Sequence, residues 1–399
     1  MEEFKKIPLL QIIFLSLLSI LLFSTYMTES LNPINSTSFA FTYEYGFISR
    51  GFMGTLFAGF CFIFKSLYSP QGLVLFTQIL AAILFILVIS LIAYCYTKID
   101  NNKTIYLTYI SYFLIVGLIS TYVSNWNLGR LDTYCLMFSI IACFAIVAGK
   151  NIWICIPCAI IATLIHQGYV FMYANIILAL LLFCAIRNRD GKRKTYMTVL
   201  AFTFLSISVL FLYMEFFSHT GKDIYYDTVV NNAGYLNMYG LYHYGVIDKE
   251  LLGISLYEDE KEFLSIALKT LFVYIIMVIP YIYVVVRFFV KLCKSAKNKT
   301  DLLSYGVLII GSLTLVPEFI LKCDYGRWIL CLIAYYIITF LVASTIDNRL
   351  IDTISDYLIP KKRFLIFISM AYIWLFAPFR DILVSYIPAY IANIIFHFV

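Results

Sequence analysis

Four arginines occupy short polar motifs between long apolar runs, and their chemistry suits an anion. The motifs are EYGFISRG (44–51), NWNLGRLD (125–132), KCDYGR (322–327) and PFRD (378–381), and they supply Arg50, Arg130, Arg327 and Arg380. A guanidinium is planar, stays charged when partly desolvated and can bind two phosphate oxygens at once. If the motifs meet at one membrane surface, we expect their arginines to bind a dianionic head group such as a pyrophosphate. The competing interpretation of each is an arginine that anchors a helix end at the lipid head groups.

Two of the four arginines have the better context for binding. Arg50 and Arg327 each follow a turn that contains Tyr and Gly and lie near an acid, Glu44 in the first case and Asp324 in the second. We therefore include Asp324 in the predicted binding site. Each of the other two arginines has an acid within two positions and can form a structural ion pair instead: Arg130 with Asp132, and Arg380 with Asp381.

Two further residues are candidates for accepting a proton. His166 begins the motif HQG (166–168), and histidine exchanges a proton near neutral pH, which suits a base that activates a sugar hydroxyl. Glu318 follows Pro317 near the end of an apolar run, where a carboxylate is costly unless it faces a cavity or an aqueous site. A histidine that is simply hydrogen-bonded in a helix turn is the competing interpretation of His166.

The segments that position these residues are predicted transmembrane helices. The chain has 399 residues, of which 62% are hydrophobic and 13% charged. Runs of roughly 20 apolar residues, the length that spans a bilayer as a helix, recur along the chain. Unbroken runs indicate helices, because barrel strands alternate every two residues. We expect an all-α bundle of about 11 or 12 spans that forms a single integral membrane domain over residues 1–399. The spans are predicted at 7–26, 72–96, 105–122, 131–148, 152–165, 169–186, 195–214, 266–290, 302–320, 328–343, 364–377 and 382–399.

The run 52–64 decides the topology, because it is too short to cross the bilayer comfortably. If it lies in the outer leaflet as a surface helix, the basic clusters near 98–103, 187–194, 291–299 and 361–363 all fall on the side of Lys5 and Lys6. The positive-inside rule makes that side cytoplasmic. The polar motifs then share the external surface, and residues 215–262 form a large extracytoplasmic loop that is long enough to be functional. The net charge of +6 therefore reports topology, and we expect no nucleic-acid partner.

Motifs for nucleotide, dinucleotide, zinc or serine-hydrolase chemistry are absent from the sequence. The pair Cys155 and Cys158 lies in an apolar run without a second pair or a nearby histidine, so we interpret it as two small core residues. We therefore expect neither a metal nor a cofactor.

This layout resembles the bacterial O-antigen and capsular polysaccharide polymerases, and more distantly the O-antigen ligases. The resemblance rests on the number of spans, the large loop and the motifs EYGFISRG, NWNLGRLD, HQG and KCDYGR, and it extends over nearly the whole chain. It implies a metal-independent glycosyltransferase of the bacterial inner membrane whose active site faces the periplasm. The implied substrate is an undecaprenyl-pyrophosphate-linked oligosaccharide, which is polymerised into O-antigen or capsular polysaccharide. Membrane lipid and a chain-length regulator protein are the other implied partners.

Carried over to this sequence, the resemblance implies that Arg50, Arg130 and Arg327 lie near the pyrophosphate. It also implies that His166 or Glu318 lies near the acceptor hydroxyl. A pyrophosphate-linked sugar is already activated, so the protein need only position it, neutralise the leaving group and accept one proton. The ligases carry their histidine in the large external loop, whereas the loop histidines of this chain have no comparable motif.

Two other functions fit parts of the sequence. A glycosyltransferase that uses a polyprenyl-monophosphate sugar would have Glu44 as its catalytic acid, followed by the surface helix 52–64, and would make one addition. A lipid-linked oligosaccharide flippase would place its polar residues near the middle of the bilayer, often with internal repeats. We find no internal repeat in this sequence.

Overall fold

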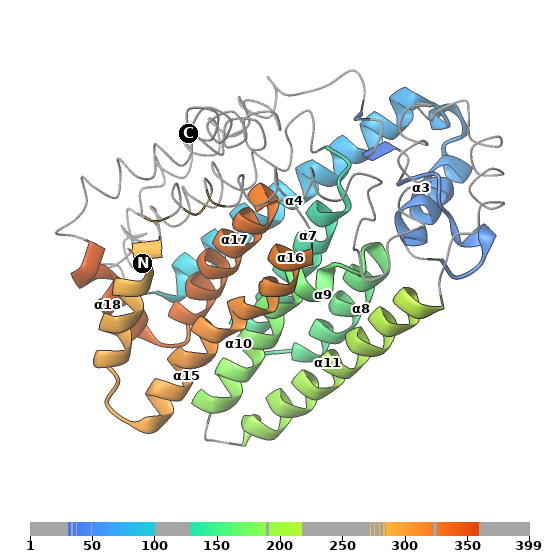
Figure 1. Ribbon diagram of the computed structural model, residues 1–399. Coiled ribbons are helices and arrows are strands. Elements are labelled where there is room, and N and C mark those ends of the chain that lie inside the picture. Colours follow the sequence, from blue (N-terminus) through green and yellow to red (C-terminus); the bar gives the residue numbers. More distant parts are fainter. Residues whose placement is uncertain are drawn as a thin grey trace, which may run out of the picture.

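The part of the chain that the computed structural model describes is a bundle of helices that lie side by side (Figure 1). It covers residues 31–99, 128–217 and 272–358, apart from positions 33, 34, 37, 49, 189, 190, 273, 274, 276–278, 280, 281, 284 and 322–324. Every regular element within these residues is helical, so the predicted all-α class is correct at this level. The α-helices are α3 (Gly51–Ile63), α4 (Pro70–Lys98), α7 (Leu131–Ala148), α8 (Cys155–Ile165), α9 (Tyr169–Met172), α10 (Ala174–Arg187), α11 (Lys192–Phe216), α15 (Lys299–Ile310), α16 (Val316–Leu321), α17 (Tyr325–Ser344) and α18 (Asn348–Leu358). Short 3-10 turns are η1 (Tyr43–Tyr45), η2 (Lys65–Leu67), η5 (Ile152–Ile154) and η6 (Gly311–Leu315).

Five helical segments in the described residues are long and apolar enough to cross a membrane: Pro70–Lys98, Leu131–Ala148, Lys192–Phe216, Lys299–Phe319 and Arg327–Ser344. They coincide with five predicted spans and indicate a helical membrane protein. The predicted spans 7–26, 105–122, 364–377 and 382–399, and most of 266–290, lie outside the described residues. Nearly all of the predicted loop 215–262 lies outside them too, and α11 continues through Phe216, past the predicted start of that loop.

The predicted span 169–186 is not one helix, because the chain leaves the helical conformation at Tyr173 between α9 and α10. The backbone carbonyl of Tyr173 accepts a hydrogen bond from Ser139 Oγ of α7 at 3.2 Å. Its hydroxyl accepts one from Cys331 Sγ of α17 at 3.3 Å. Hydrogen bonds therefore fix the break to α7 and α17, and α10 packs against both of these helices.

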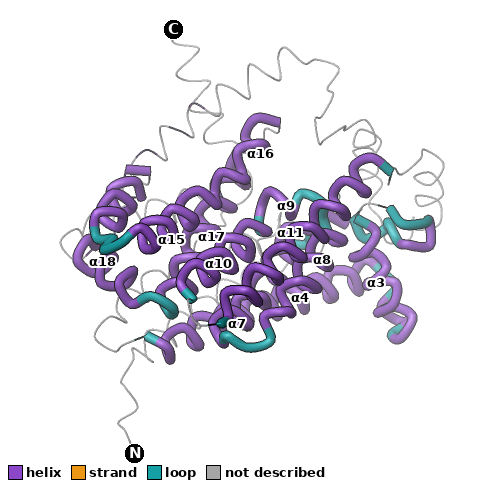
Figure 2. The backbone as a smooth tube through the Cα atoms, turned by 90° about the horizontal axis from the view of Figure 1, so that it is seen from below, coloured by secondary structure: helices purple, strands orange, loops and turns teal. Residues whose placement is uncertain are grey.

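The short helix α3 packs at the end of the bundle where α7 begins (Figures 1 and 2). Its 13 residues give a length of about 20 Å, less than the hydrocarbon core of a bilayer at roughly 30 Å. The ring of Phe39 meets Phe57 of α3, Phe76 of α4 and Tyr134 of α7 edge to face, with centroids 6.2 to 6.3 Å apart. This aromatic cluster joins α3 to the first turns of α4 and α7.

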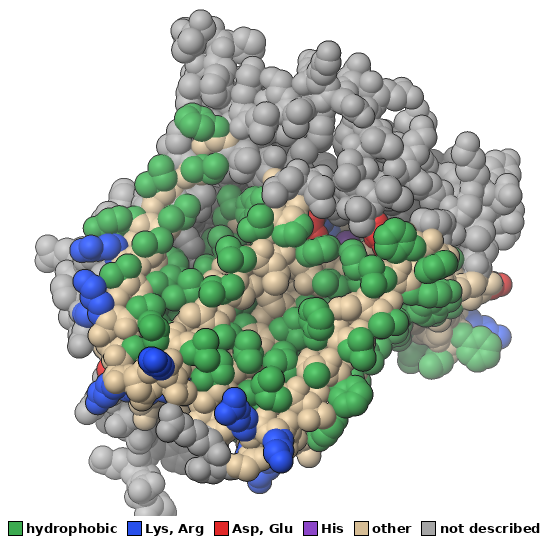
Figure 3. Space-filling view, turned by 60° about the horizontal axis from the view of Figure 1, so that its bottom comes forward, with side chains coloured by type: hydrophobic (Ala, Val, Ile, Leu, Met, Phe, Trp, Pro, Cys, Tyr) green, Lys and Arg blue, Asp and Glu red, His purple; other side chains and the backbone are tan. Residues whose placement is uncertain are grey.

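The two ends of the bundle differ in charge. α7 and α17 begin and α8 ends at one end of the bundle, which we name the Asp132 end after the residue that lies there. α7 and α10 end and α15 begins at the opposite end, which we name the Arg187 end. Figure 3 shows basic side chains along the lower and left margins of a largely hydrophobic face, with acidic and histidine side chains at the upper margin. The exposed basic residues of the Arg187 end are Lys98, Lys150, Lys192, Arg193, Lys194, Lys294, Lys297 and Lys299.

Candidate functional site

Three of the predicted motifs meet at one buried carboxylate. Asp132 of NWNLGRLD is 1% exposed, and its Oδ2 lies 3.0 Å from Nη1 of Arg327 in KCDYGR. Its Oδ1 lies 3.8 Å from Nε2 of His166, the first residue of HQG. We name Asp132, His166 and Arg327 the Asp132 centre. Its members come from the start of α7, the residue after α8 and the start of α17, so helix packing brings together residues that are far apart in sequence.

The local sequence explains the position of Asp132. The carboxylate lies in the first turn of α7, where the helix dipole favours negative charge. Gly129 precedes it with a φ of 86°, a left-handed conformation that favours glycine, and Arg130 is the N-cap residue. A buried carboxylate is costly unless it is paired. The ion pair with Arg327 offsets that cost, and the positive charge of Arg130 also stabilises the carboxylate.

His166 is oriented by its own turn. Its Nδ1 accepts a hydrogen bond from the backbone N–H of Gly168 at 2.8 Å, and a Cβ at Gly168 would lie 2.8 Å from the imidazole. In the neutral ring the proton is therefore on Nε2, the nitrogen that faces Asp132. The separation of 3.8 Å is too long for a hydrogen bond but short enough for electrostatic attraction once the ring is protonated. This geometry favours proton donation at Nε2 over the predicted role as a base.

Arg327 combines an ion pair with partial exposure. Its Nη1 donates to Asp132, and its guanidinium carbon lies 4.5 Å from the centroid of the Trp328 ring, within cation–π range. The side chain is 22% exposed. A guanidinium has five N–H donors in a fixed fork, so this group is held in place while it still reaches the surface of the described part.

The segment before α3 reaches the same end of the bundle. Asn35 Nδ2 donates to the carbonyl of Leu128 at 2.9 Å, and the Phe39 ring packs beside Gly129. Arg50 is the N-cap residue of α3, with a left-handed φ of 64° and a partly exposed side chain. Glu44 is exposed on η1. The contacts of Asn35 and Phe39 bring the segment that precedes EYGFISRG next to Leu128 and Gly129 of NWNLGRLD.

The other predicted site residues have different outcomes. Glu318 is 4% exposed on α16, and α16 packs against α17. Asp324 and Arg380 lie outside the described residues, as do positions 125–127. Among the residues that the structure describes, no group of three or more His, Cys, Asp or Glu side chains is placed to hold a metal ion.

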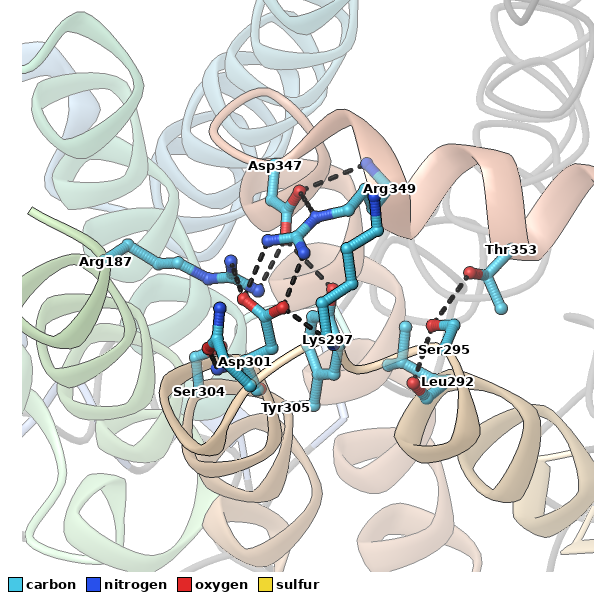
Figure 4. Close-up of polar contacts among 11 residues, drawn as sticks. Arg187, Leu292, Ser295, Lys297, Asp301, Ser304, Tyr305, Asp347, Arg349 and Thr353 are labelled. Atoms are coloured by element: carbon cyan, nitrogen blue, oxygen red, sulfur yellow. Dashed lines mark hydrogen bonds and ion pairs between the residues drawn. The ribbon is translucent and has the colours of Figure 1, made fainter.

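A second set of buried charges lies at the Arg187 end, and the sequence analysis did not identify it. Arg187, Asp301, Asp347 and Arg349 form this Arg187 cluster (Figure 4). Arg187 lies 2.7 Å from Asp301 and 2.6 Å from Asp347, and Arg349 contacts the same two carboxylates. Tyr305 donates a hydrogen bond to Asp347 at 3.1 Å. The hydrogen bonds with Asp301 raise the pKa of Arg349, so its charge is permanent.

Three members of the Arg187 cluster have the charge that their helix end favours, and the fourth, Arg349 in the first turn of α18, is held by the two carboxylates instead. Arg187 is in the last turn of α10, and Asp301 is in the first turn of α15. Asp347 precedes α18 and accepts the backbone N–H of Arg349 at 3.1 Å. These are the signs that the helix dipole stabilises at each terminus. The sequence signal that could have been used is Asn298, three residues before Asp301, which caps α15.

Of the residues predicted from the sequence, His166 and Arg327 meet directly at Asp132, and Arg130 lies beside it. Asp132 itself was predicted only as a structural partner of Arg130, although an acid in the first turn of an apolar span signals a special environment. Comparison with protein-family models, with curated proteins and with solved structures finds no match for this chain.

Proposed function

We propose that this chain is a glycosyltransferase that polymerises undecaprenyl-pyrophosphate-linked oligosaccharide repeat units at the outer face of the bacterial cytoplasmic membrane. The observation that carries the proposal is the meeting of cationic side chains at Asp132. This carboxylate has two arginines beside it, Arg327 and Arg130, and His166 lies 3.8 Å away. An anion with several oxygens, such as a pyrophosphate, is the natural complement of these side chains.

The proposed side of the membrane follows from the contrast between the two ends of the bundle. The exposed lysines and arginines of the Arg187 end favour a cytoplasmic position by the positive-inside rule. The 18 residues of α7 extend about 27 Å, close to the thickness of the hydrocarbon core. The Asp132 centre then lies near the outer surface. This depth favours an enzyme that meets its substrate at the surface over a transporter with a site at mid-bilayer.

In the proposed reaction, the acceptor hydroxyl oxygen attacks the anomeric carbon of the donor sugar. A glycosidic C–O bond forms as the bond from that carbon to the pyrophosphate oxygen breaks, and undecaprenyl pyrophosphate leaves. Arg327 and Arg130 neutralise the charge that develops on the leaving group. His166 supports the same charge through its Nε2–H, and Glu318 is the candidate base for the hydroxyl proton.

Gene deletion with complementation tests this proposal. The deletion strain should carry surface lipid capped by single repeat units, and the wild-type gene should restore long chains. Arg327→Ala should restore about a hundredth of the polymer or less, the size of loss expected when one donor to a developing charge is removed. Arg193→Ala, an exposed arginine of the Arg187 end, is the matched control and should restore it fully. Long chains in the deletion strain, or complete loss of surface glycan, would contradict the proposal.

A polyprenyl-monophosphate-dependent glycosyltransferase is the second candidate, because Glu44 is exposed on η1 directly before the short helix α3. In that case Glu44→Gln should abolish activity while His166→Gln is tolerated. The polymerase proposal predicts the reverse order of sensitivity. Both variants can be compared in the same complemented strain, at equal amounts of protein in the membrane.

A further inference from the structure

Three buried polar side chains near the Asp132 centre have no hydrogen-bond partner within the part of the chain that the structure describes. They are Thr133 through its hydroxyl, Asn175 through both amide atoms and Trp328 through its indole N–H. Their exposed fractions are 2%, 1% and 2%. More than nine-tenths of buried polar groups in native proteins are paired, so each of these calls for an explanation.

The three side chains belong to helices that contact one another. Thr133 follows Asp132 on α7, Trp328 follows Arg327 on α17, and Asn175 lies in the first turn of α10. These three helices pack in pairs. Asn175 comes two residues after Tyr173, whose carbonyl and hydroxyl are bonded to α7 and α17. Since the α17 contact is at Cys331, one turn beyond Arg327, Asn175 lies about one turn further into the bundle than the charged centre.

Other buried hydroxyls without partners occur in the described residues, so burial alone does not make a site. Thr203 of α11 and Ser344 at the end of α17 are of this kind, and neither adjoins the Asp132 centre in sequence. What distinguishes the α7–α10–α17 junction is that the unpartnered groups are on three helices that contact one another, and that Thr133 and Trp328 directly follow two members of the Asp132 centre. Asn175 alone offers two N–H donors and a carbonyl acceptor there.

We infer that Thr133, Asn175 and Trp328 bind hydroxyl groups of the sugar that is attached to the pyrophosphate. The inference rests on the proposed function. A sugar hydroxyl both donates and accepts hydrogen bonds, which matches an amide and a threonine hydroxyl together. Phosphate oxygens only accept, so the carbonyl of Asn175 is a poor partner for the pyrophosphate. The charged centre and this junction therefore recognise two neighbouring parts of one substrate.

A pair of identical substitutions tests the inference. Thr133→Val and Thr203→Val each replace an unpartnered buried hydroxyl by a methyl group, so each should leave the Tm of the purified protein unchanged or raise it. Thr133→Val should lower polymer formation in the complemented deletion strain about tenfold, the value of one hydrogen bond to substrate. Thr203→Val should make polymer like the wild type. Asn175→Leu, which removes both donors and the acceptor, should show a loss larger than that of Thr133→Val at an equal or higher Tm.

Two results would overturn the inference and leave the proposed function intact. One is wild-type polymer from both Thr133→Val and Asn175→Leu. The other is a clear fall in Tm for both variants but not for Thr203→Val, which would show that the groups have structural partners.

Thermal-shift measurements separate the sugar from the pyrophosphate. Undecaprenyl pyrophosphate alone should raise the Tm of the wild type and of Thr133→Val equally. The sugar-bearing lipid extracted from the deletion strain should raise the Tm of the wild type further, and that of Thr133→Val no further. Equal additional shifts would overturn the sugar assignment. No shift with either lipid would instead count against the proposed function.

Discussion

The Asp132 centre and the Arg187 cluster both bury carboxylates against arginines, yet they differ in charge balance. In the Arg187 cluster two carboxylates face two arginines, so the charges cancel. At the Asp132 end one carboxylate faces Arg327 and Arg130, with His166 at 3.8 Å. A balanced set has no charge left for a ligand and serves to join helix ends. An unbalanced positive set is suited to an anion, at the cost of some stability.

The polar groups around the two sites also differ in their hydrogen-bond partners. Around the Arg187 cluster, the Tyr305 hydroxyl and the backbone N–H of Lys297 donate to the carboxylates. Beside the Asp132 centre, Thr133, Asn175 and Trp328 have polar atoms without partners among the described residues. The carboxylates of the Arg187 cluster thus have several donors, although Arg187 Nε has no hydrogen-bond partner among the described residues. Unpartnered groups on three adjoining helices are expected where a ligand supplies the missing partners.

The largest expected effect is on stability at the Arg187 cluster. Asp301→Ala leaves two arginines facing one remaining carboxylate, and breaking a buried pair in this way costs about 3–5 kcal/mol. Chemical unfolding of the purified protein should show this loss. Glu44→Ala removes an exposed carboxylate and should change the free energy of unfolding by less than about 0.5 kcal/mol. Equal effects of the two substitutions would remove the structural role of the cluster.

At the Asp132 centre the corresponding change should separate stability from function. Asp132→Asn should cost about 1–3 kcal/mol, because Arg327 is partly exposed and water can replace part of its ion pair. The substitution also raises the net charge of the centre by one, so binding of undecaprenyl pyrophosphate should become tighter. Polymer formation should nevertheless fall, because Arg327 loses its fixed position. Thermal shifts with the lipid and polymer gels measure the two effects, and weaker binding would contradict the electrostatic argument.

The smallest expected effect is that of a disulfide cross-link at the Arg187 end on polymer formation. The hydroxyl oxygens of Ser295 and Thr353 lie 3.4 Å apart across this end (Figure 4), which makes Ser295→Cys/Thr353→Cys a suitable pair for a disulfide. If the cluster is a permanent connection, oxidation in isolated membranes should leave polymer formation unchanged. Loss of activity on oxidation and its recovery with a reductant would show that this end opens during the cycle, as a transporter requires. Each single-cysteine variant serves as a control.

Sequence patterns predicted individual helices better than the contacts between them. The predicted span 131–148 coincides with α7, because an unbroken apolar run needs no information from the rest of the chain. The pair of Asp132 and Arg327 is separated by 195 positions, and only the packing of α7 against α17 brings it together. The break at Tyr173 has the same origin, since its anchors are on two other helices. Arg187 was expected only as a cytoplasmic charge, because its partners lie in distant segments.

The most direct test of the central claim is the affinity of the purified protein for undecaprenyl pyrophosphate in nanodiscs. The wild type and Arg193→Ala, whose changed residue is exposed at the Arg187 end, should bind the lipid with the same Kd. Arg327→Ala should bind it at least about tenfold more weakly, since a charge-assisted contact contributes about 1.5–3 kcal/mol. Equal affinities of Arg327→Ala and the wild type would show that the Asp132 centre is not an anion site.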